Sequence, residues 1–378
     1  MSYLKCLLIL LIGFSTITLY AQEENFLRGR VYETTSNIPI VYATVRIKGK
    51  AKGVITNMDG GFRLPKNLYQ LGDTIQVSSM GYQLTNFPIS KLSPSEINII
   101  RLPTTIFSLD EAVVSAKRKK RLTARQIVKK AIERIPINYL TSGFSQKGYS
   151  RDYQLDSEVY LNLNEAILEV YDPGFDYNDS NYSEVSIYES RLNEAFKRND
   201  RAAKAYDYLN YEKIIDKAFL PSYGGNEFLI LRVHDAIRNF RVNSFDYVNV
   251  LNDGDLVANH SFRKFHETSL GDEKLYKIGL IRRMEDFRAL GTIYISKNDF
   301  AIHKLEYAVF DRTFEGERSV EEYQKEGKLI FEVITEYKRG RNNKMELNFI
   351  SFHNNFTLAA PSKFIIEEVV FRPDRKAI

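Results

Sequence analysis

The residues best suited to metal chemistry are five histidines, His234, His260, His266, His303 and His353. One pair, His303-Lys-Leu-Glu306, has the spacing of two zinc ligands in a catalytic site. It lies in IHKLEYAV, a predicted strand, where residues three apart point to opposite faces and cannot share one ion. His260 and His266 would lie about 20 Å apart on an extended strand, too far for a chelate unless a turn intervenes. We therefore expect no metal site.

Other catalytic patterns are also missing from the sequence. It contains no GxSxG elbow, no P-loop and no GxGxxG fingerprint. The acidic pairs Glu321-Glu322 and Glu367-Glu368 are adjacent in the chain, so on strands their side chains diverge, and no glycosidase dyad can be argued from them. We expect no catalytic residue, no cofactor and no enzymatic activity.

One short pattern could contact a ligand or a partner protein. Arg151 is flanked by Tyr149 and Tyr153 in QKGYSRDY. A guanidinium between aromatic rings can hold an anion or a sugar, and the same pattern suits a structural ion pair with stacked rings. Both interpretations stay open, with Tyr149, Arg151 and Tyr153 as candidate contacts.

Composition narrows the class of protein. The 378 residues include 44% hydrophobic and 13% aromatic residues, enough for two or three domains with buried cores. The aromatic residues are 24 Tyr and 24 Phe without Trp, which favours pleated β surfaces. A net charge of +5 from 53 basic and 48 acidic residues is too small an excess to indicate nucleic-acid binding.

The first residues predict export. MSYLKCLLILLIGFSTITLYAQ places one Lys before an apolar run and ends at Ala21-Gln22, so residues 1–21 are typical of a signal peptide. An uncleaved anchor is the alternative reading. Cys6 precedes the apolar run, so it cannot be the lipidated cysteine of a lipoprotein. Because Cys6 is the only cysteine, the exported chain can form no disulfide. We expect a periplasmic or outer-membrane-associated protein, with the cell surface as a further possibility.

Residues 22–102 read as short strands joined by turns. IVYATVRIKG alternates apolar and polar residues, and Asp59-Gly60-Gly61 lies between two extended arms, which predicts a tight hairpin over residues 53–64. Asp59 could bind a cation, although an Asp before Gly is typical of turn geometry. About seven such strands predict an all-β Greek-key sandwich.

Motifs in this segment carry a family resemblance. They are Gly29-x-Val31, Pro39-Ile40-x-Tyr42-Ala43-x-Val45, Gly53 with Thr56, Asp59-Gly60-x-Phe62 and Gly81-Tyr82. Residues 27 to 102 thereby resemble the carboxypeptidase-regulatory-like domain. The resemblance implies a transthyretin-like (prealbumin-like) fold, a secreted protein of Bacteroidetes type, and no catalytic residues in this domain.

Residues 103–121 are predicted to be a linker ending in the basic run Lys117 to Arg121. This run could contact anionic lipid or lipopolysaccharide and so associate with a membrane, or it could be a solvated linker. SLDEAVVSA is similar to the segment that follows this domain in TonB-dependent receptors. No glycine-rich plug follows it, so we do not expect a transporter.

Residues 122–378 are predicted to form an α+β domain. Thr123 and Gln126 can make a capping box for a helix that Pro136 ends, and its apolar stripe should dock on the domain's own core or on another protein. KLYKIGLIRR and the strands after it predict a curved antiparallel sheet or half-barrel. By strand pattern alone it looks like periplasmic lipoprotein carriers, and residues 122 to 370 resemble Bacteroidetes proteins without an assigned function. Within the polar stretch 176–226, EAFKRNDRAAKAYDYLNYEKIIDKAF predicts a helix.

Three functional hypotheses follow. The first is an exported, non-enzymatic envelope protein that binds a ligand or a partner protein through its β-rich domains, the ligand being a glycan or a lipid. The second is an envelope hydrolase of glycans or peptides with carboxylate catalysis. The third is an adaptor of outer-membrane complexes. The sequence does not predict the oligomeric state.

Overall fold

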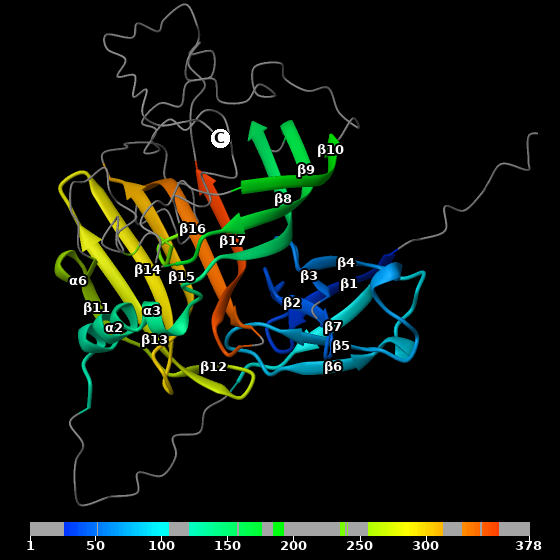
Figure 1. Ribbon diagram of the computed structural model, residues 1–378, viewed down its shortest axis with the longest axis horizontal. Coiled ribbons are helices and arrows are strands. Elements are labelled where there is room, and N and C mark those ends of the chain that lie inside the picture. Colours follow the sequence, from blue (N-terminus) through cyan, green and yellow to red (C-terminus); the bar gives the residue numbers. More distant parts are fainter. Residues whose placement is uncertain are drawn as a thin grey trace, which may run out of the picture. The chain divides into compact units, whose positions relative to one another are not determined.

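A computed structural model describes ten segments of the chain: residues 26–50, 52–105, 121–156, 159–175, 184–192, 235–238, 240, 256–312, 327–340 and 342–354. These residues form two compact units (Figure 1). The first contains the N-terminal strands together with Glu267–Leu275, and the second contains the remaining described residues.

The first unit consists of two antiparallel-rich sheets. One sheet has the order β4-β1-β7, and the other has the order β3-β2-β5-β6. Within the first sheet β1 pairs antiparallel with β4 and parallel with β7. The elements are β1 (Phe26–Glu33), β2 (Thr44–Ile47), β3 (Gly53–Ile55), β4 (Gly61–Pro65), η1 (Lys66–Leu68), β5 (Thr74–Ser78), β6 (Thr85–Pro88), η2 (Ile89–Lys91) and β7 (Asn98–Leu102).

Alternating residues build the core between these sheets. Buried residues alternate with more exposed ones along most of β1, β4 and β7, and their side chains meet the buried residues of β2 and β5. Leu27, Val31 and Leu64 from one sheet share this core with Val45 and Ile75 from the other. The prediction of an all-β N-terminal sandwich is confirmed.

The predicted hairpin over residues 53–64 is wrong. The turn itself forms, because Gly60 has a φ of 73° and Gly61 N donates to Asn57 Oδ1 over 2.7 Å. However, β3 pairs with β2, whereas β4 pairs with β1 in the other sheet. The Asp-Gly-Gly turn therefore carries the chain from one layer of the sandwich to the other.

A segment distant in the sequence completes the first unit. Glu267–Leu275 contains β12 (Thr268–Leu270), which pairs with the first residues of β13 (Glu273–Arg283). Ser269 O accepts a hydrogen bond from Gly81 N over 3.1 Å. Gly81 has a φ of 88°, a conformation that favours glycine. The glycine of the Met-Gly-Tyr motif therefore allows the backbone conformation at the hydrogen bond to Ser269.

In the second unit, α2 (Ala124–Glu133) has the predicted start. Thr123 Oγ1 accepts from Gln126 N, and Gln126 Oε1 accepts from Thr123 N, so the capping box is confirmed. Ile127, Val128 and Ala131 are buried in the unit's own core, as one of the two sequence alternatives predicted. Pro136 lies in the first turn of the short helix α3 (Ile135–Asn138).

Two antiparallel sheets make up the rest of this unit. A three-stranded sheet has the order β10-β9-β8, and a seven-stranded sheet has the order β11-β13-β14-β15-β16-β17, with β12 beside β13. The prediction of an α+β unit with a curved, open antiparallel sheet is confirmed. The remaining elements are β8 (Phe144–Asp156), β9 (Val159–Asp172), β10 (Glu184–Leu192), α6 (Leu256–Asn259), β11 (Ser261–Lys264), β14 (Phe287–Ser296), β15 (Ile302–Asp311), β16 (Lys328–Arg339) and β17 (Met345–Asn354).

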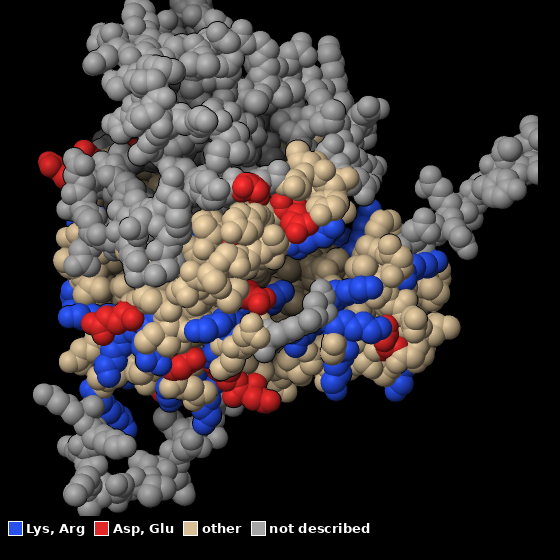
Figure 2. All heavy atoms as spheres, in the orientation of Figure 1, with Lys and Arg blue, Asp and Glu red and all other residues tan. Residues whose placement is uncertain are grey.

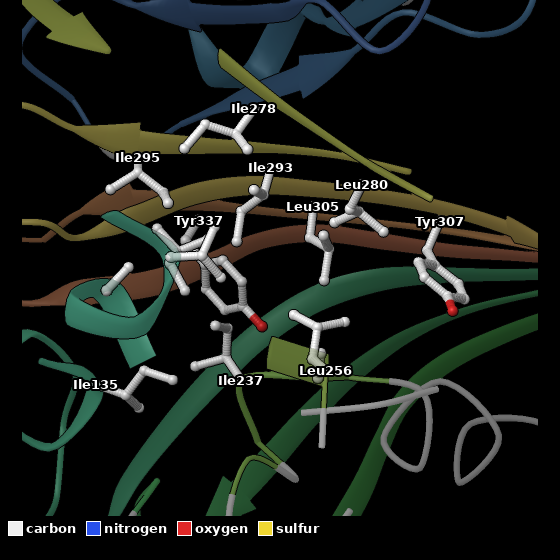
Figure 3. Packing of buried hydrophobic residues seen from close by; sticks show 14 of the residues in the cluster. Ile135, Ile237, Leu256, Ile278, Leu280, Ile293, Ile295, Leu305, Tyr307 and Tyr337 are labelled. Carbon is white, nitrogen blue, oxygen red and sulfur yellow. The ribbon is translucent and has the colours of Figure 1, made fainter. Parts of the chain in front are cut away.

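One face of the seven-stranded sheet carries the core of the second unit. Figure 3 shows side chains of its strands, Ile293, Leu305 and Tyr337 among them, gathered with Ile135, Ile237 and Leu256. Tyr139 joins this core, donating from its hydroxyl to Ile302 O over 2.6 Å and meeting the Tyr337 ring edge-on at 5.2 Å. The core thus ties α2, α3 and the sheet together.

A buried ion pair also belongs to this core. Arg238 Nη2 lies 2.8 Å from Asp172 Oδ1, with both side chains almost fully buried. Arg238 also donates to Gly174 O, and Tyr337 donates to Asp235. Because each charge compensates the other, removal of one partner would cost about 3–5 kcal/mol. The pair fastens residues 235–238 to the end of β9.

Some sequence predictions fall outside the described residues. They are the basic residues Lys117 to Lys120, the helix predicted within residues 176–226, and the last predicted strand, KFIIEEVVFR.

The α2 contact can be tested with two isoleucines. Ile127→Ala should lower the free energy of unfolding by about 2–5 kcal/mol, because it removes a buried side chain and leaves a cavity. Ile137→Ala makes the same change at a side chain that is 50% exposed, and should stay within about 0.5 kcal/mol of the wild type. Urea denaturation followed by circular dichroism measures both, and equal losses would contradict the α2 packing.

Candidate functional site

Strand β8 places the three predicted contact residues on one face of the three-stranded sheet. Residues two apart on a strand share a face, so Tyr149, Arg151 and Tyr153 lie in one row. The Tyr149 side chain is 63% exposed and that of Tyr153 is 42% exposed. Register pairs Tyr149 with Ile167 and Arg151 with Glu165 on β9. The sheet thus brings the predicted residues together and adds partners from the next strand.

Glu165 links two of the predicted residues. The Tyr149 hydroxyl donates a hydrogen bond to Glu165, and Arg151 Nε lies 3.9 Å from the same carboxylate. The Arg151 guanidinium also lies 5.2 Å from the centre of the Tyr153 ring. Arg151 is therefore in a surface ion pair with an adjacent ring, as one of the two sequence interpretations describes. A role of these residues as ligand contacts stays a prediction.

A second, similar group lies further along the same face. Lys147 pairs in register with Glu169, and its Nζ lies 3.3 Å from the centre of the Tyr188 ring on β10. The Tyr188 hydroxyl donates to Glu169, and this hydrogen bond to an anion raises the pKa of Tyr188. A β-bulge between Ile187 and Glu189 accompanies this position. The sequence reasoning did not identify this group.

We call this surface the tyrosine face. Its members are Lys147, Tyr149, Arg151 and Tyr153 of β8, Glu165, Ile167, Glu169 and Tyr171 of β9, and Tyr188 of β10. Two of its tyrosines have hydroxyls fixed by carboxylates while their rings remain exposed. Rigid amphipathic rings of this kind give large contact areas at low entropic cost in protein interfaces. The period-two pattern E-A-I-L-E-V-Y of β9 was the signal that could have revealed the second row.

A separate group of charges lies on the seven-stranded sheet. We call it the glutamate cluster: Lys304 and Glu306 of β15, with Glu332 and Glu336 of β16. Lys304 Nζ lies 2.6 Å from Glu306 Oε1 and pairs in register with Glu336, which accepts from Asn348 over 2.9 Å. Burial raises the pKa of Glu332, with repulsion from Glu306 adding to it, and burial likewise raises the pKa of Glu336. The cluster thus holds two carboxyl groups, those of Glu332 and Glu336, whose pKa lies above the ordinary value.

The histidines occupy separate positions. His260 is buried, with Nδ1 at 3.0 Å from Leu256 O and Nε2 at 2.8 Å from the Tyr307 hydroxyl. His303 is buried at a position three residues from Glu306 on strand β15, so the two side chains point to opposite faces. Within the described segments, no three His, Asp, Glu or Cys side chains lie close enough together to hold a metal ion.

None of the helices in the described segments has the length and apolar character needed to cross a bilayer.

Comparison with known proteins identifies a domain in the N-terminal part of the chain. Residues 27–114 match the family model described as the CarboxypepD_reg-like domain. The chain is also 38% identical over 111 residues to the TonB-dependent receptor SusC of Bacteroides thetaiotaomicron. That alignment covers 29% of this chain and only 10% of the receptor, so the chain spans about a tenth of the relative's length. No solved structure matches the chain.

The matched residues include the two sheets of the sandwich and the turns that carry the predicted motifs. The resemblance drawn from those motifs is confirmed. Residues 27–114 of this β-rich protein are a CarboxypepD_reg-like domain.

Proposed function

We propose that this chain is an exported, non-catalytic protein of a bacterial envelope that binds a partner protein through the tyrosine face. The observation that carries the proposal is the exposure of Tyr149, Tyr153 and Tyr188 together on one sheet face. Exposed aromatic patches framed by charges are typical of interaction sites, and Tyr is enriched in interface cores. The paired charges of this face suit a polar rim around those rings.

The location rests on two further observations. The N-terminal apolar run has the features of an export signal. The relative with 38% identity is a TonB-dependent receptor, which supports an envelope setting and a role beside outer-membrane complexes. We accordingly propose a signal peptide at residues 1–21, a sandwich at 22–102, a linker at 103–121 and an α+β domain at 122–378.

The glutamate cluster supports a second candidate function. An envelope hydrolase would need one carboxyl group protonated and another ionised, and a raised pKa suits the protonated role. Glu332 and Glu336 both have raised pKa values on one strand. The short ion pair between Lys304 and Glu306 favours a structural role instead, because it already neutralises part of the cluster.

Substitution of the exposed tyrosines should remove partner binding. We expect Tyr149→Ala/Tyr153→Ala/Tyr188→Ala to reduce the recovery of a co-purifying protein at least about tenfold, because interface tyrosines commonly contribute more than 1 kcal/mol each. The measurement is affinity purification of the tagged full chain from its native envelope, followed by quantitative mass spectrometry of bound proteins and lipids.

The matched control removes three exposed apolar side chains elsewhere. Ile38→Ala/Met58→Ala/Leu71→Ala changes residues that are 60%, 66% and 78% exposed. It should leave the recovered protein unchanged. Two outcomes would contradict a protein-binding tyrosine face. One is equal recovery of the co-purifying protein with the wild type, the tyrosine variant and the control variant, and the other is recovery of lipid or glycan alone.

Glu332 gives the glutamate cluster a pH signature. The pKa of Glu332 in the folded protein lies above its ordinary value of 4.5. The ionised carboxylate therefore destabilises the fold, and this effect is complete at a pH above the folded-state pKa. It becomes smaller as the pH falls toward 4.5. Glu332→Gln should therefore be more stable than the wild type at pH 8, with a difference that shrinks toward pH 5. Urea denaturation between pH 5 and 8 measures this, with the exposed Glu133→Gln as control.

The same variant separates the two candidate functions. If Glu332→Gln keeps its stability but abolishes a measured turnover of glycan or peptide substrates, the chain is a hydrolase and the binding proposal fails. Loss of stability at every pH would instead show that the ionised carboxylate of Glu332 is favourably paired in the folded protein.

A further inference from the structure

The outer face of the sheet β4-β1-β7 carries arginine on every strand. The inward positions of these strands are buried, so the alternate positions face outward. The outward residues are Phe26, Arg28, Arg30 and Tyr32 of β1, Gly61, Arg63 and Pro65 of β4, and Ile99 and Arg101 of β7. None of these described outward positions carries Asp or Glu. We call this surface, with Ile97 just before β7, the arginine face.

The strand register places like charges opposite each other. Arg28 lies directly opposite Arg63 in the antiparallel pair of β1 and β4. Facing like charges destabilise a sheet, and acidic residues at such positions would stabilise it. Three of these arginines also have partners within the unit. Arg28 Nη2 donates to Ser95 O over 3.0 Å, and Arg101 Nη1 donates to Asn37 Oδ1 over 2.8 Å. Arg30 Nη2 lies 3.2 Å from Asp59 Oδ2, in the turn before β4.

The sandwich residues 26–105 carry more positive charge than the rest of the chain, although Glu267–Leu275 of the same unit adds three acidic residues and one basic residue. Residues 26–105 contain ten Lys and Arg against four Asp and Glu, whereas the full chain has a net charge of only +5. The remainder of the chain therefore has slightly more acidic than basic residues. Basic side chains are conspicuous over the first unit in the space-filling view (Figure 2). A partner for this unit should be acidic.

The residue types indicate a protein partner in preference to a membrane. All four cations of the arginine face are Arg, while Lys48, Lys50 and Lys52 lie elsewhere in the unit. Attraction to an anionic bilayer needs only charge, which Lys supplies equally well. The planar fork of Arg instead forms directional bidentate bonds with carboxylates and is enriched at protein interfaces. Exposed Phe26, Ile97 and Ile99 add apolar contacts, with 41%, 50% and 53% of each side chain exposed.

We propose that the arginine face binds an acidic segment of a partner protein in extended conformation. Arg28 and Arg30 are two residues apart, a separation of about 7 Å on a strand. Carboxylates at alternate positions of an extended segment repeat at the same spacing, so each can meet one guanidinium. The apolar side chains between these carboxylates point to the opposite side of the extended segment, where they can pack against the rest of the partner protein. This proposal does not depend on the tyrosine face, which lies in the other unit.

The test measures binding of a defined peptide to the full chain. The probe is a fluorescent twelve-residue peptide with Glu at alternate positions and Leu between them, and the comparison peptide has Gln in place of Glu. Fluorescence anisotropy at 50 and 300 mM NaCl should show binding of the Glu peptide that weakens with salt. Arg63→Glu/Arg101→Glu should raise its Kd at least tenfold, because both side chains are exposed and each changes sign.

A charge-matched control distinguishes a site from net charge. Lys48→Glu/Lys52→Glu makes the same change in charge at exposed positions outside the arginine face, and should alter the Kd less than threefold. Equal weakening by both double variants, or binding of the Gln peptide with the same Kd, would overturn the proposal. Sedimentation with vesicles of phosphatidylcholine containing 30% phosphatidylglycerol is the second arm. Arginine-dependent binding to these vesicles without binding to the Glu peptide would show a membrane surface and would equally overturn it.

Discussion

Among the described residues, the two sheets of the sandwich and the seven-stranded sheet each pack one face into a core, so binding must use the outward side chains of their strands. Ladder hydrogen bonds fix the register, and the period of two then decides which residues share a surface. The tyrosine face and the arginine face are both consequences of this rule. On each face, side chains that are distant in the sequence become neighbours because the pairing of two strands holds them side by side. Arg151 lies opposite Glu165, and Arg28 lies opposite Arg63, through register alone.

The two faces differ in how their charges are balanced. On the tyrosine face each cation lies near a carboxylate, as Arg151 does with Glu165 and Lys147 with Glu169 across the strands. On the arginine face the carboxylate of Asp59 lies near Arg30, but none of the described outward positions of the three strands carries Asp or Glu. A balanced face with exposed rings gains most of its contact energy from apolar area, whereas an unbalanced face gains speed and selectivity from long-range attraction. The two surfaces therefore suit different partners, or different parts of one partner.

Local signals in the sequence predicted local structure well. The Thr123 and Gln126 capping box, the apolar stripe of α2 and the strands between Lys274 and Phe352 all depend on residues close together in the chain. Pairing between strands was harder to predict. The Asp59-Gly60 turn specified its own backbone conformation but not which sheet each arm joins, because positive φ is a local property. Likewise, β8 alone suggested Tyr149, Arg151 and Tyr153, but only the pairing with β9 identifies Glu165 as the partner of Tyr149 and Arg151.

The β-bulge between Ile187 and Glu189 has a further consequence for how the protein behaves at high concentration. In the described three-stranded sheet, β10 is an edge strand, and its outer backbone groups could template another strand. An extra residue disrupts the regular ladder and increases the local twist. The bulge thereby makes the edge of β10 a poor site for pairing with a strand of a second copy. An exposed aromatic surface can therefore lie beside this edge without promoting edge-to-edge aggregation.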